Sequence, residues 1–172
     1  MGDGPVADGV TWHDCLDRAR RVLDTCSAQG LRIATAESCT GGLVAGALTA
    51  IAGSSAVVDS GVITYDNAAK VRLLGVDPTL FDRVGAVSAE VAGAMADGLL
   101  ARAPVDLTVS VTGIAGPGGA TPAKPIGLVF IGCARAGRTT RTARHHFPGD
   151  RTAVRLASVH AALGLVLEAC AD

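Results

Sequence analysis

Segments with the pattern of buried strands alternate with segments of helical periodicity along the first two-thirds of this chain. A helical segment at 12–28 stops at Gly30, a residue that favours the end of a helix. Strand-like runs follow at 31–37, 56–65 and 105–112, and helical segments at 42–51, 66–75 and 88–103 separate them. This alternation is typical of α/β proteins, in which helices cover both faces of a sheet with largely parallel strands.

The last third of the chain adds a different pattern. Two strand-like runs, 126–137 and 138–147, meet in a short turn, which predicts an antiparallel hairpin. A hairpin makes the sheet mixed rather than wholly parallel. A long helix is expected at 149–171 with Asp150 as its N-cap, and 76–88 is expected to be an irregular connection. The sequence thus predicts an α/β fold with five strands and five helices.

The composition limits the protein to one domain and excludes several classes of partner. We expect residues 1–11 to be disordered and 12–172 to form a single domain, since 172 residues are too few for two ordinary domains. Aromatic residues make up only 3%, so alanine, valine and leucine must fill the core. A net charge of -1 supplies no basic field for nucleic acid or an anionic membrane, and we expect neither as a partner.

The N-terminal sequence and the cysteines predict a cytoplasmic protein. The cysteines and histidines also predict that the protein binds no metal. The N-terminus has neither the basic nor the apolar region of a signal peptide, and we expect no membrane span. The five cysteines form no CxxC pair, which argues against structural zinc and favours reduced thiols. The pair His145-His146 lacks a third ligand at metal spacing, so we assign no metal and no cofactor.

Three loops follow the three strands that the alternation predicts to be parallel. They contain the sequences AESCTGG at 36–42, TYDNAAK at 64–70 and TGIAGPGG at 112–119. Ligands of open α/β sheets bind beyond the carboxyl ends of parallel strands. If the three strands are neighbours in the sheet, these loops converge on one site.

The first loop allows two interpretations. Ser38 can be a nucleophile on a turn whose free N–H groups, up to Gly42, stabilise a developing oxyanion at a helix N-terminus. Alternatively, Ser38 or Thr40 merely caps that helix, which from position alone is the more common role. Cys39 is a less favoured nucleophile, because nothing nearby in the sequence lowers the pKa of its thiol.

The second loop contains a tyrosine and a lysine. Tyr65 is the only tyrosine of the chain, and Lys70 lies in or near the first turn of the helix that follows. The positive end of the helix dipole lowers the pKa of a lysine there, and a partly buried lysine can then act as a general base. The alternative is a solvated surface lysine, which is the usual environment of this side chain.

The third loop and the start of the last helix offer groups for an anion. The glycine-dense stretch 113–119 is neither a Walker A loop nor a dinucleotide fingerprint, but its amides can wrap a phosphate. A plain flexible connection is the alternative. Arg151 stands at a helix N-terminus, where its charge opposes the dipole, so we expect either a bound anion or a pair with Asp150 or another exposed carboxylate.

Five stretches of the chain together resemble the CinA C-terminal domain family, the nicotinamide-nucleotide amidohydrolases. The stretches are TAESCTGGLVAGALT, GVITYDNAAKVRLLGV, GAVSAEVAGAMADG, VTGIAGPGGATPAKPIGLVFI and FPGDR, and the similarity runs from about Trp12 to the end of the chain. The resemblance implies a three-layer α/β/α sandwich with a mixed, mostly parallel central sheet. It also implies hydrolysis of the carboxamide of nicotinamide mononucleotide, which gives nicotinate mononucleotide and ammonia.

The resemblance also assigns roles to residues. It implies that Ser38 is the nucleophile, that Lys70 is its general base and that Tyr65 relays or positions the proton. The residues implied to bind the substrate or its oxyanion are Cys39, Thr40, Gly41, Gly42, Thr112, Gly113, Ile114, Gly116 and Arg151. Serine–lysine chemistry of this kind needs neither a metal nor a cofactor.

Two further expectations concern the assembly and an alternative activity. Small members of the family are usually assemblies, so we expect a homo-oligomer that acts on a small nucleotide in the cytoplasm. The alternative is a non-catalytic nucleotide-binding or interaction module linked to competence or DNA damage, an association that the family's name carries. The set of Ser38, Tyr65 and Lys70 favours the enzyme, since a binding module needs none of them.

Overall fold

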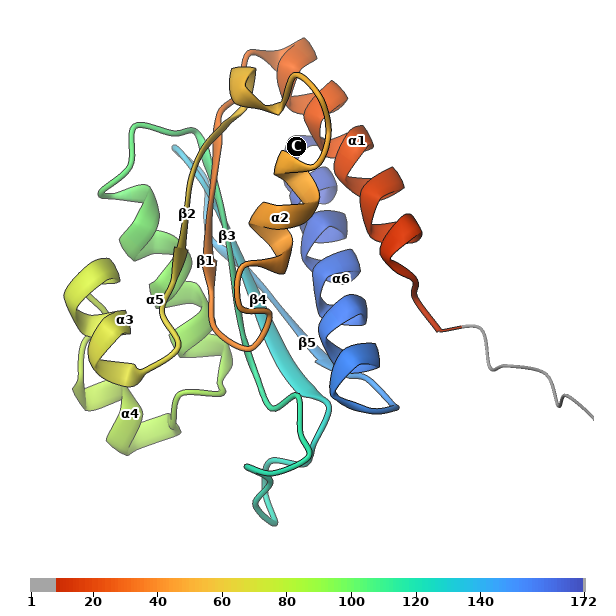
Figure 1. Ribbon diagram of the computed structural model, residues 1–172. Coiled ribbons are helices and arrows are strands. Elements are labelled where there is room, and N and C mark those ends of the chain that lie inside the picture. The colour runs from red at the N-terminus through yellow and green to blue at the C-terminus, as the bar shows by residue number, and fades with distance from the viewer. Residues whose placement is uncertain (1–8, 172) are drawn as a thin grey trace, which may run out of the picture.

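The chain forms a five-stranded sheet between two layers of helices (Figure 1). The computed structural model describes residues 9–171. The strands are β1 (Ile33–Glu37), β2 (Val58–Ile63), β3 (Leu107–Gly113), β4 (Leu128–Arg135) and β5 (Arg141–His146). The helices are α1 (Trp12–Gln29), α2 (Leu43–Thr49), α3 (Asn67–Leu74), α4 (Thr79–Val84), α5 (Ala89–Leu100) and α6 (Arg151–Ala171), with one short 3₁₀ helix, η1 (Ser54–Ala56).

The sheet is mixed, and its parallel part lies at one side. The strand order is β2-β1-β3-β4-β5, in which β1 pairs in parallel with β2 and β3, and β4 pairs antiparallel with β3 and β5. Four strands therefore run in one direction and β4 alone runs in the other, which confirms the mixed, mostly parallel sheet. Glu37 lies opposite Ile63 and Val111, so β1, β2 and β3 end at the same edge and the loops that follow them converge.

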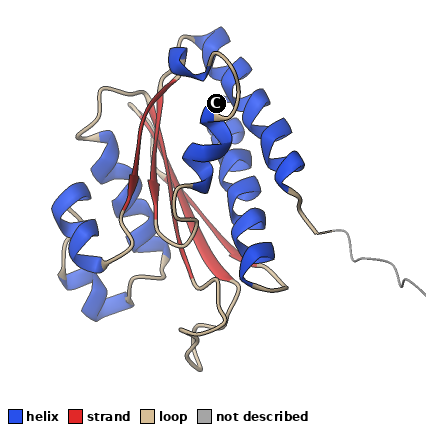
Figure 2. Cartoon of the chain, viewed as in Figure 1, coloured by secondary structure: helices blue, strands red, loops and turns tan. Residues whose placement is uncertain are grey.

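Helices cover both faces of the sheet, which confirms the three-layer α/β/α arrangement (Figure 2). Helices α1, α2 and α6 lie on one face, and α3, α4 and α5 lie on the other (Figure 1). Each interface has its own buried cluster: Ile33 belongs to the first, and Ala34 and Ala36 belong to the second. Because side chains alternate along a strand, Glu37 contacts α2, whereas Ser38, the next residue, contacts α3.

Hydroxyl groups on the central strand β3 attach α5 closely to the sheet. Thr108 and Ser110 are buried and donate to backbone carbonyls of α5 at 2.8 and 2.6 Å. Thr112, two residues on, donates to the carbonyl of Ala86, just before α5, at 2.9 Å. These bonds satisfy polar groups whose burial would otherwise be unfavourable, and they place the carboxyl end of β3 beside the start of α5.

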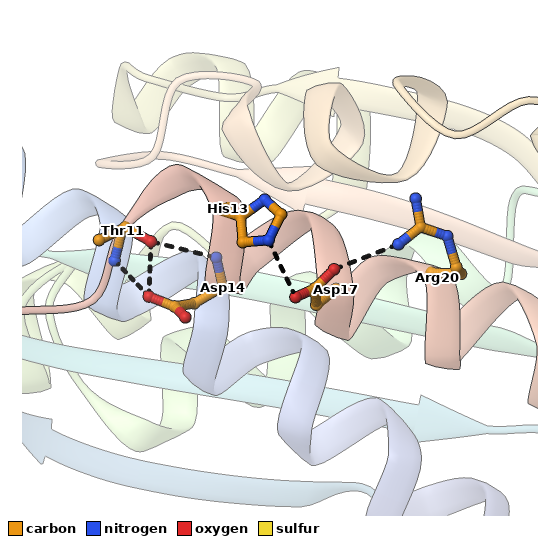
Figure 3. Close-up of polar contacts among 5 residues, drawn as sticks. All are labelled: Thr11, His13, Asp14, Asp17 and Arg20. Carbon is orange, nitrogen blue, oxygen red and sulfur yellow. Dashed lines mark hydrogen bonds and ion pairs between the residues drawn. The ribbon is translucent and has the colours of Figure 1, made fainter.

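A capping box begins α1. The Asp14 N–H donates to the Thr11 hydroxyl at 3.2 Å, and the Thr11 N–H donates to the Asp14 carboxylate at 2.8 Å (Figure 3). Further along the same helix, His13 and Arg20 both contact the carboxylate of Asp17 (Figure 3). The reciprocal bonds fix the start of the helix near the residue that the periodicity predicts.

Two expectations from the sequence are modified. The stretch 76–88 is not wholly irregular, because Thr79–Val84 forms α4, which brings the described helices to six. The disorder predicted for 1–11 concerns mainly residues outside the described ones, although Thr11 is placed and caps α1.

Helix α6 is long and apolar enough to cross a membrane by length and composition, with a mean hydropathy of 1.5. Half of that window is buried, and α6 packs on α1, β3 and β4, so it is a core helix of this fold.

A buried carboxylate joins the end of β1 to the start of α2. Glu37 is only 1% exposed. Its carboxylate accepts the backbone N–H groups of Gly42, Val44 and Ala45 at distances of 3.0, 3.0 and 2.8 Å, and the Thr35 hydroxyl donates to it at 3.2 Å. Negative charge is favourable at a helix N-terminus, since the N–H groups there carry partial positive charge. Glu37 thus caps α2 from the preceding strand.

We expect Glu37→Gln to lower the free energy of unfolding by about 3 kcal/mol, in the range for buried hydrogen bonds to a charged group. The amide nitrogen of glutamine would face N–H donors of α2 that a carboxylate oxygen now accepts. Chemical denaturation followed by circular dichroism measures the change. Glu90→Gln is the control, because Glu90 is exposed, and its effect should stay within about 0.5 kcal/mol. A Glu37 variant as stable as the wild type would contradict the capping role.

A glycine in α5 lets α3, the helix of Lys70, approach closely. A Cβ atom at Gly98 would lie 1.9 Å from the backbone oxygen of Leu74, the last residue of α3. Gly93, earlier in the same helix, has room, because the nearest atom to a Cβ there would be 3.5 Å away. The absence of a side chain at Gly98 therefore sets how near α3 lies to α5.

We expect Gly98→Ala to destabilise the fold by about 2 kcal/mol, since the added methyl group overlaps backbone that moves only if α3 shifts. Gly93→Ala should be neutral or stabilise by up to about 1 kcal/mol, because alanine favours a helix. Thermal unfolding of both variants beside the wild type compares them directly. If the two substitutions have equal effects, close helix packing is not the role of Gly98.

Candidate active site

A cavity of about 260 Å³ lies at the edge where β1, β2 and β3 end. Its lining consists of Ser38, Cys39, Tyr65, Asn67, Lys70, Ala86, Val87, Thr112, Gly113, Ile114, Ala115, Gly116, Gly118, Gly119 and Arg151. All three loops that the sequence singles out contribute, together with the first residue of α6. These lining residues include two cationic side chains, Lys70 and Arg151, and no Asp or Glu, so the cavity suits an anionic ligand.

Two other features of the fold do not compete with this cavity. A larger cavity of about 490 Å³ lies between α1, β5 and α6, but none of the residues that the sequence predicts for the site lines it. Within residues 9–171, no group of three His, Cys, Asp or Glu side chains is placed to hold a metal ion. The smaller cavity therefore contains the candidate chemistry.

Lys70, in α3, is almost wholly buried, with 1% of its surface exposed. Its Nζ lies 3.2 Å from the Oγ of Ser38, 2.7 Å from the carbonyl oxygen of Thr64 and 3.4 Å from that of Tyr65. Burial lowers the pKa of Lys70 below its usual 10.5, because the ammonium loses hydration, and the nearby Asp66 carboxylate opposes this only in part. The alternative of a solvated surface lysine is therefore wrong.

Ser38 extends β1 by one residue and lies against Lys70. Its N–H donates to the carbonyl oxygen of Val111 at 2.9 Å, which continues the pairing with β3. The residue is 9% exposed and lines the cavity. The Ser38 hydroxyl is thus fixed between the end of the sheet and an amine that can accept its proton.

The turn after Ser38 does not use its own hydroxyls as caps. Gly42 is the N-cap of α2 without a side-chain capping bond, and the buried Thr40 hydroxyl has no hydrogen-bond partner among the described residues. The interpretation of Ser38 or Thr40 as the cap is therefore wrong, because the Glu37 carboxylate takes these N–H groups. Of the turn residues predicted to bind substrate, Cys39 lines the cavity, whereas Thr40, Gly41 and Gly42 do not.

The thiol of Cys39 is poorly suited to be a nucleophile. The residue is 5% exposed, and burial raises the pKa of its thiol to about 12. A thiol with such a pKa stays protonated at neutral pH, and only the thiolate is strongly nucleophilic. The hydroxyl of Ser38 is thus the candidate nucleophile of this turn.

Arg151 bridges two loops across the cavity. Its Nη1 donates to the carbonyl oxygen of Gly116 at 2.8 Å, and its Nη2 donates to the hydroxyl of Tyr65 at 3.0 Å. The Tyr65 ring itself is largely exposed. The predicted alternative, a pair with Asp150, is absent from the salt bridges of residues 9–171, since Asp150 caps α6 through the N–H of Ala153.

The loop between β3 and β4 contains, beside the cavity, backbone N–H groups without partners among residues 9–171. Its base is closed by the Ile114 N–H, which donates to Leu128 at 2.9 Å, and by the Gly127 N–H, which donates to Ile114 at 2.8 Å. Beyond this base, the N–H groups of Gly118 and Gly119 make no hydrogen bond within the described residues. Both glycines line the cavity, so their amides are available to a ligand.

Two charged residues next to the site are absent from the sequence-based prediction. One is Glu37, for which an acidic residue at the end of an apolar strand is the available signal. The other is Arg155, one turn beyond Arg151, whose guanidinium donates to the carbonyl oxygens of Cys39 and Thr40 at 3.2 and 2.9 Å. No local pattern marks Arg155, because its partners are backbone groups more than 100 residues away.

Known families and sequences identify the domain. The family model of the CinA C-terminal domain matches residues 16–170. A CinA-like protein of Mycolicibacterium vanbaalenii is 52% identical over 140 residues, which are 81% of this chain and 33% of that protein. The nicotinamide-nucleotide amidohydrolase PncC of Enterobacter agglomerans is 52% identical over 129 residues, which are 75% of this chain and 79% of that protein. The chain thus spans about a third of the CinA-like relative and most of the PncC relative.

Solved structures share the fold over nearly the whole chain. The competence/damage inducible protein CihA from Agrobacterium tumefaciens matches with a TM-score of 0.89 and 43% identity, over 100% of both chains. A CinA superfamily protein from Escherichia coli matches with a TM-score of 0.87 and 34% identity, over 96% of this chain and 94% of that one. The family model, the sequence relatives and the common fold show that this chain belongs to the CinA C-terminal domain family.

Proposed function

We propose that this chain is a serine amidohydrolase that deamidates nicotinamide mononucleotide to nicotinate mononucleotide and ammonia. The observation that carries the proposal is the buried Lys70, whose Nζ lies 3.2 Å from the Oγ of Ser38 in a cavity without carboxylates. The 52% identity to a protein named nicotinamide-nucleotide amidohydrolase supports the substrate class.

Neutral Lys70 is arranged to take the proton of Ser38. An uncharged amine has two N–H donors and one lone pair. The carbonyl oxygens of Thr64 and Tyr65 accept the two N–H groups, which leaves the lone pair for the hydroxyl of Ser38. The proton then moves from Oγ to Nζ as Oγ attacks the carboxamide carbon.

The oxygen of the attacked carboxamide becomes negative and needs hydrogen-bond donors. Cys39 follows the nucleophile directly and lines the cavity, and the N–H of the residue after a serine nucleophile commonly serves this purpose. Collapse of the tetrahedral intermediate transfers the proton from Lys70 to the leaving nitrogen and expels ammonia. Water then hydrolyses the acyl ester on Ser38, with Lys70 again as the base.

Arg151 is the candidate partner of the substrate phosphate, because it is a permanent cation in the lining. The Tyr65 hydroxyl accepts a hydrogen bond from Arg151, so its own proton is free for the ligand. A positioning role for Tyr65 fits this geometry better than a proton relay, since Ser38 and Lys70 contact each other directly.

Three further expectations stay predictions. They are a homo-oligomeric state, a cytoplasmic location, and activity without a cofactor or a nucleic-acid partner. The first follows from family resemblance, the second follows from the cysteine usage, and the last follows from the serine–lysine chemistry and the net charge of -1.

We expect the wild type to release ammonia from nicotinamide mononucleotide, and Ser38→Ala and Lys70→Met to lose at least about 10³-fold in kcat. Lys70→Met keeps the length of the buried side chain but removes the amine. A coupled ammonia assay measures turnover, and titration calorimetry tests whether Ser38→Ala still binds the nucleotide. Lys124→Met is the control, because Lys124 is the only other lysine of the chain and does not line the cavity.

The same measurements separate the enzyme from its alternative. Folded wild-type protein that binds the mononucleotide and releases no ammonia would favour a non-catalytic nucleotide-binding module. Full activity of Lys70→Met would contradict the serine–lysine mechanism but would not contradict nicotinamide mononucleotide as the substrate.

We expect kcat/KM to rise with pH and to reach its plateau below pH 10.5, the usual pKa of a lysine. Only the neutral amine accepts a proton, and burial lowers the pKa of Lys70, so the active form appears at lower pH than it would for a solvated lysine. The pH–rate profile of ammonia release measures this, and the Kd of Ser38→Ala across the same pH range separates binding from chemistry. A rate that falls as the pH rises through this range would exclude Lys70 as the base.

A further inference from the structure

Arg155 reaches from α6 to the turn after Ser38 without entering the cavity. Its Nε donates to the carbonyl oxygen of Cys39 at 3.2 Å, and its Nη2 donates to that of Thr40 at 2.9 Å. The residue is half-buried and does not line the cavity. No salt bridge among residues 9–171 involves it. The guanidinium charge therefore acts mainly on two peptide carbonyls.

Two peptide units, Thr40–Gly41 and Ser38–Cys39, are joined by a hydrogen bond and connect this charge to the nucleophile. The Thr40 carbonyl and the Gly41 N–H belong to one trans peptide, so they point in opposite directions. Arg155 donates to that carbonyl, and the Gly41 N–H donates to the carbonyl oxygen of Ser38 at 3.0 Å. The Ser38 carbonyl shares its peptide unit with the N–H of Cys39, and Cys39 is one of the residues that line the cavity. The chain of bonds thus ends at the N–H that the proposed mechanism assigns to the oxyanion.

A charge at one end of such a chain strengthens the donor at the other end. Hydrogen-bonded peptides polarise one another, and bonds to a charged group are stronger than neutral ones. A carbonyl that accepts from a guanidinium withdraws electron density from its own amide nitrogen, so the attached N–H becomes a better donor. Glu37 binds the opposite kind of backbone group. Arg155 donates to carbonyl oxygens at the start of the turn, whereas the Glu37 carboxylate accepts the N–H groups of Gly42 and Val44 at its end.

We propose that Arg155 is a positioning residue of this site, which holds the turn after Ser38 and strengthens the Cys39 N–H as an oxyanion donor. The inference rests on the proposed function and adds a residue that does not touch the substrate. The stronger donor acts on the charge of the transition state rather than on the neutral carboxamide. Loss of Arg155 therefore lowers kcat and leaves KM nearly unchanged.

The first test is steady-state kinetics on nicotinamide mononucleotide. We expect Arg155→Met to lower kcat about 10- to 100-fold, less than the loss of a whole oxyanion donor, with KM within about twofold of the wild type. Arg155→Lys keeps the charge and should recover part of the loss. Arg18→Met is the matched control: Arg18 is also half-buried and donates to a carbonyl, that of His160 at 3.1 Å, away from the cavity. Its kcat should equal that of the wild type.

The second test measures the same donor without the nucleotide. A fluorophosphonate reacts with Ser38 by forming a bond from Oγ to phosphorus and expelling fluoride, while Lys70 takes the serine proton. An oxyanion donor stabilises the phosphoryl oxygen in that transition state. Mass spectrometry gives the labelling rate, which should fall about tenfold or more in Arg155→Met and stay constant in Arg18→Met.

The outcomes separate this inference from the proposed function. Wild-type kcat and labelling rate in Arg155→Met would overturn the inference, as would a loss confined to KM and the melting temperature, which is the result of a merely structural role. If the wild type is labelled at Ser38 but releases no ammonia, the proposal that nicotinamide mononucleotide is the substrate is overturned. The labelling rates of the variants then decide the role of Arg155.

Discussion

The site depends on the hydrogen bonds between the buried carboxylate of Glu37 and the N–H groups at the start of α2. Strand β1 is paired on both sides, by β2 and β3, so its end has little freedom, and Glu37 ties the start of α2 to that end. A buried ion costs several kcal/mol of desolvation unless hydrogen bonds compensate it. Here three backbone N–H groups and the Thr35 hydroxyl do so, and the helix terminus is capped without Ser38. The serine hydroxyl is therefore left free for chemistry.

The end of β1 also keeps the carboxylate of Glu37 apart from the amine of Lys70. Glu37 contacts α2 and Ser38 contacts Lys70 of α3, because consecutive side chains of a strand point to opposite faces. A carboxylate beside Lys70 would favour its ammonium form and raise its pKa. Asp66 exerts such an effect, Glu37 does not, and burial, which lowers the pKa of Lys70, outweighs the effect of Asp66. The alternation of a strand thus places the buried carboxylate of Glu37 on one face of the sheet and Lys70, the proposed base, on the other.

The sequence predicts the elements other than α4, and the edge of the sheet where the site lies, because both follow from local patterns. Periodicity marks the strands, and parallel neighbours must end at one edge. The contact of Ser38 with Lys70 was expected from family resemblance and not from spacing, since 32 residues separate them. The contacts of Arg151 with Tyr65 and of Arg155 with Thr40 span 86 and 115 residues. The second uses a backbone carbonyl, a group that every residue has, so no sequence pattern can mark it.

The arginines near the start of α6 bind the loops of the site and do not stabilise the helix itself. Arg151 stands at the N-terminus, where the dipole disfavours a cation by about 0.3–1 kcal/mol, and no acidic residue lies in the first turn. Acidic residues there would suit the dipole, but they would face carbonyl oxygens and bring negative charge to a cavity suited to anions. Arg151 offsets its unfavourable position by donating to the carbonyl oxygen of Gly116. Arg155, one turn later, donates to the carbonyl oxygens of Cys39 and Thr40. The start of this one helix therefore supplies both the cation that we propose for the ligand, Arg151, and the charge behind the turn after Ser38, Arg155.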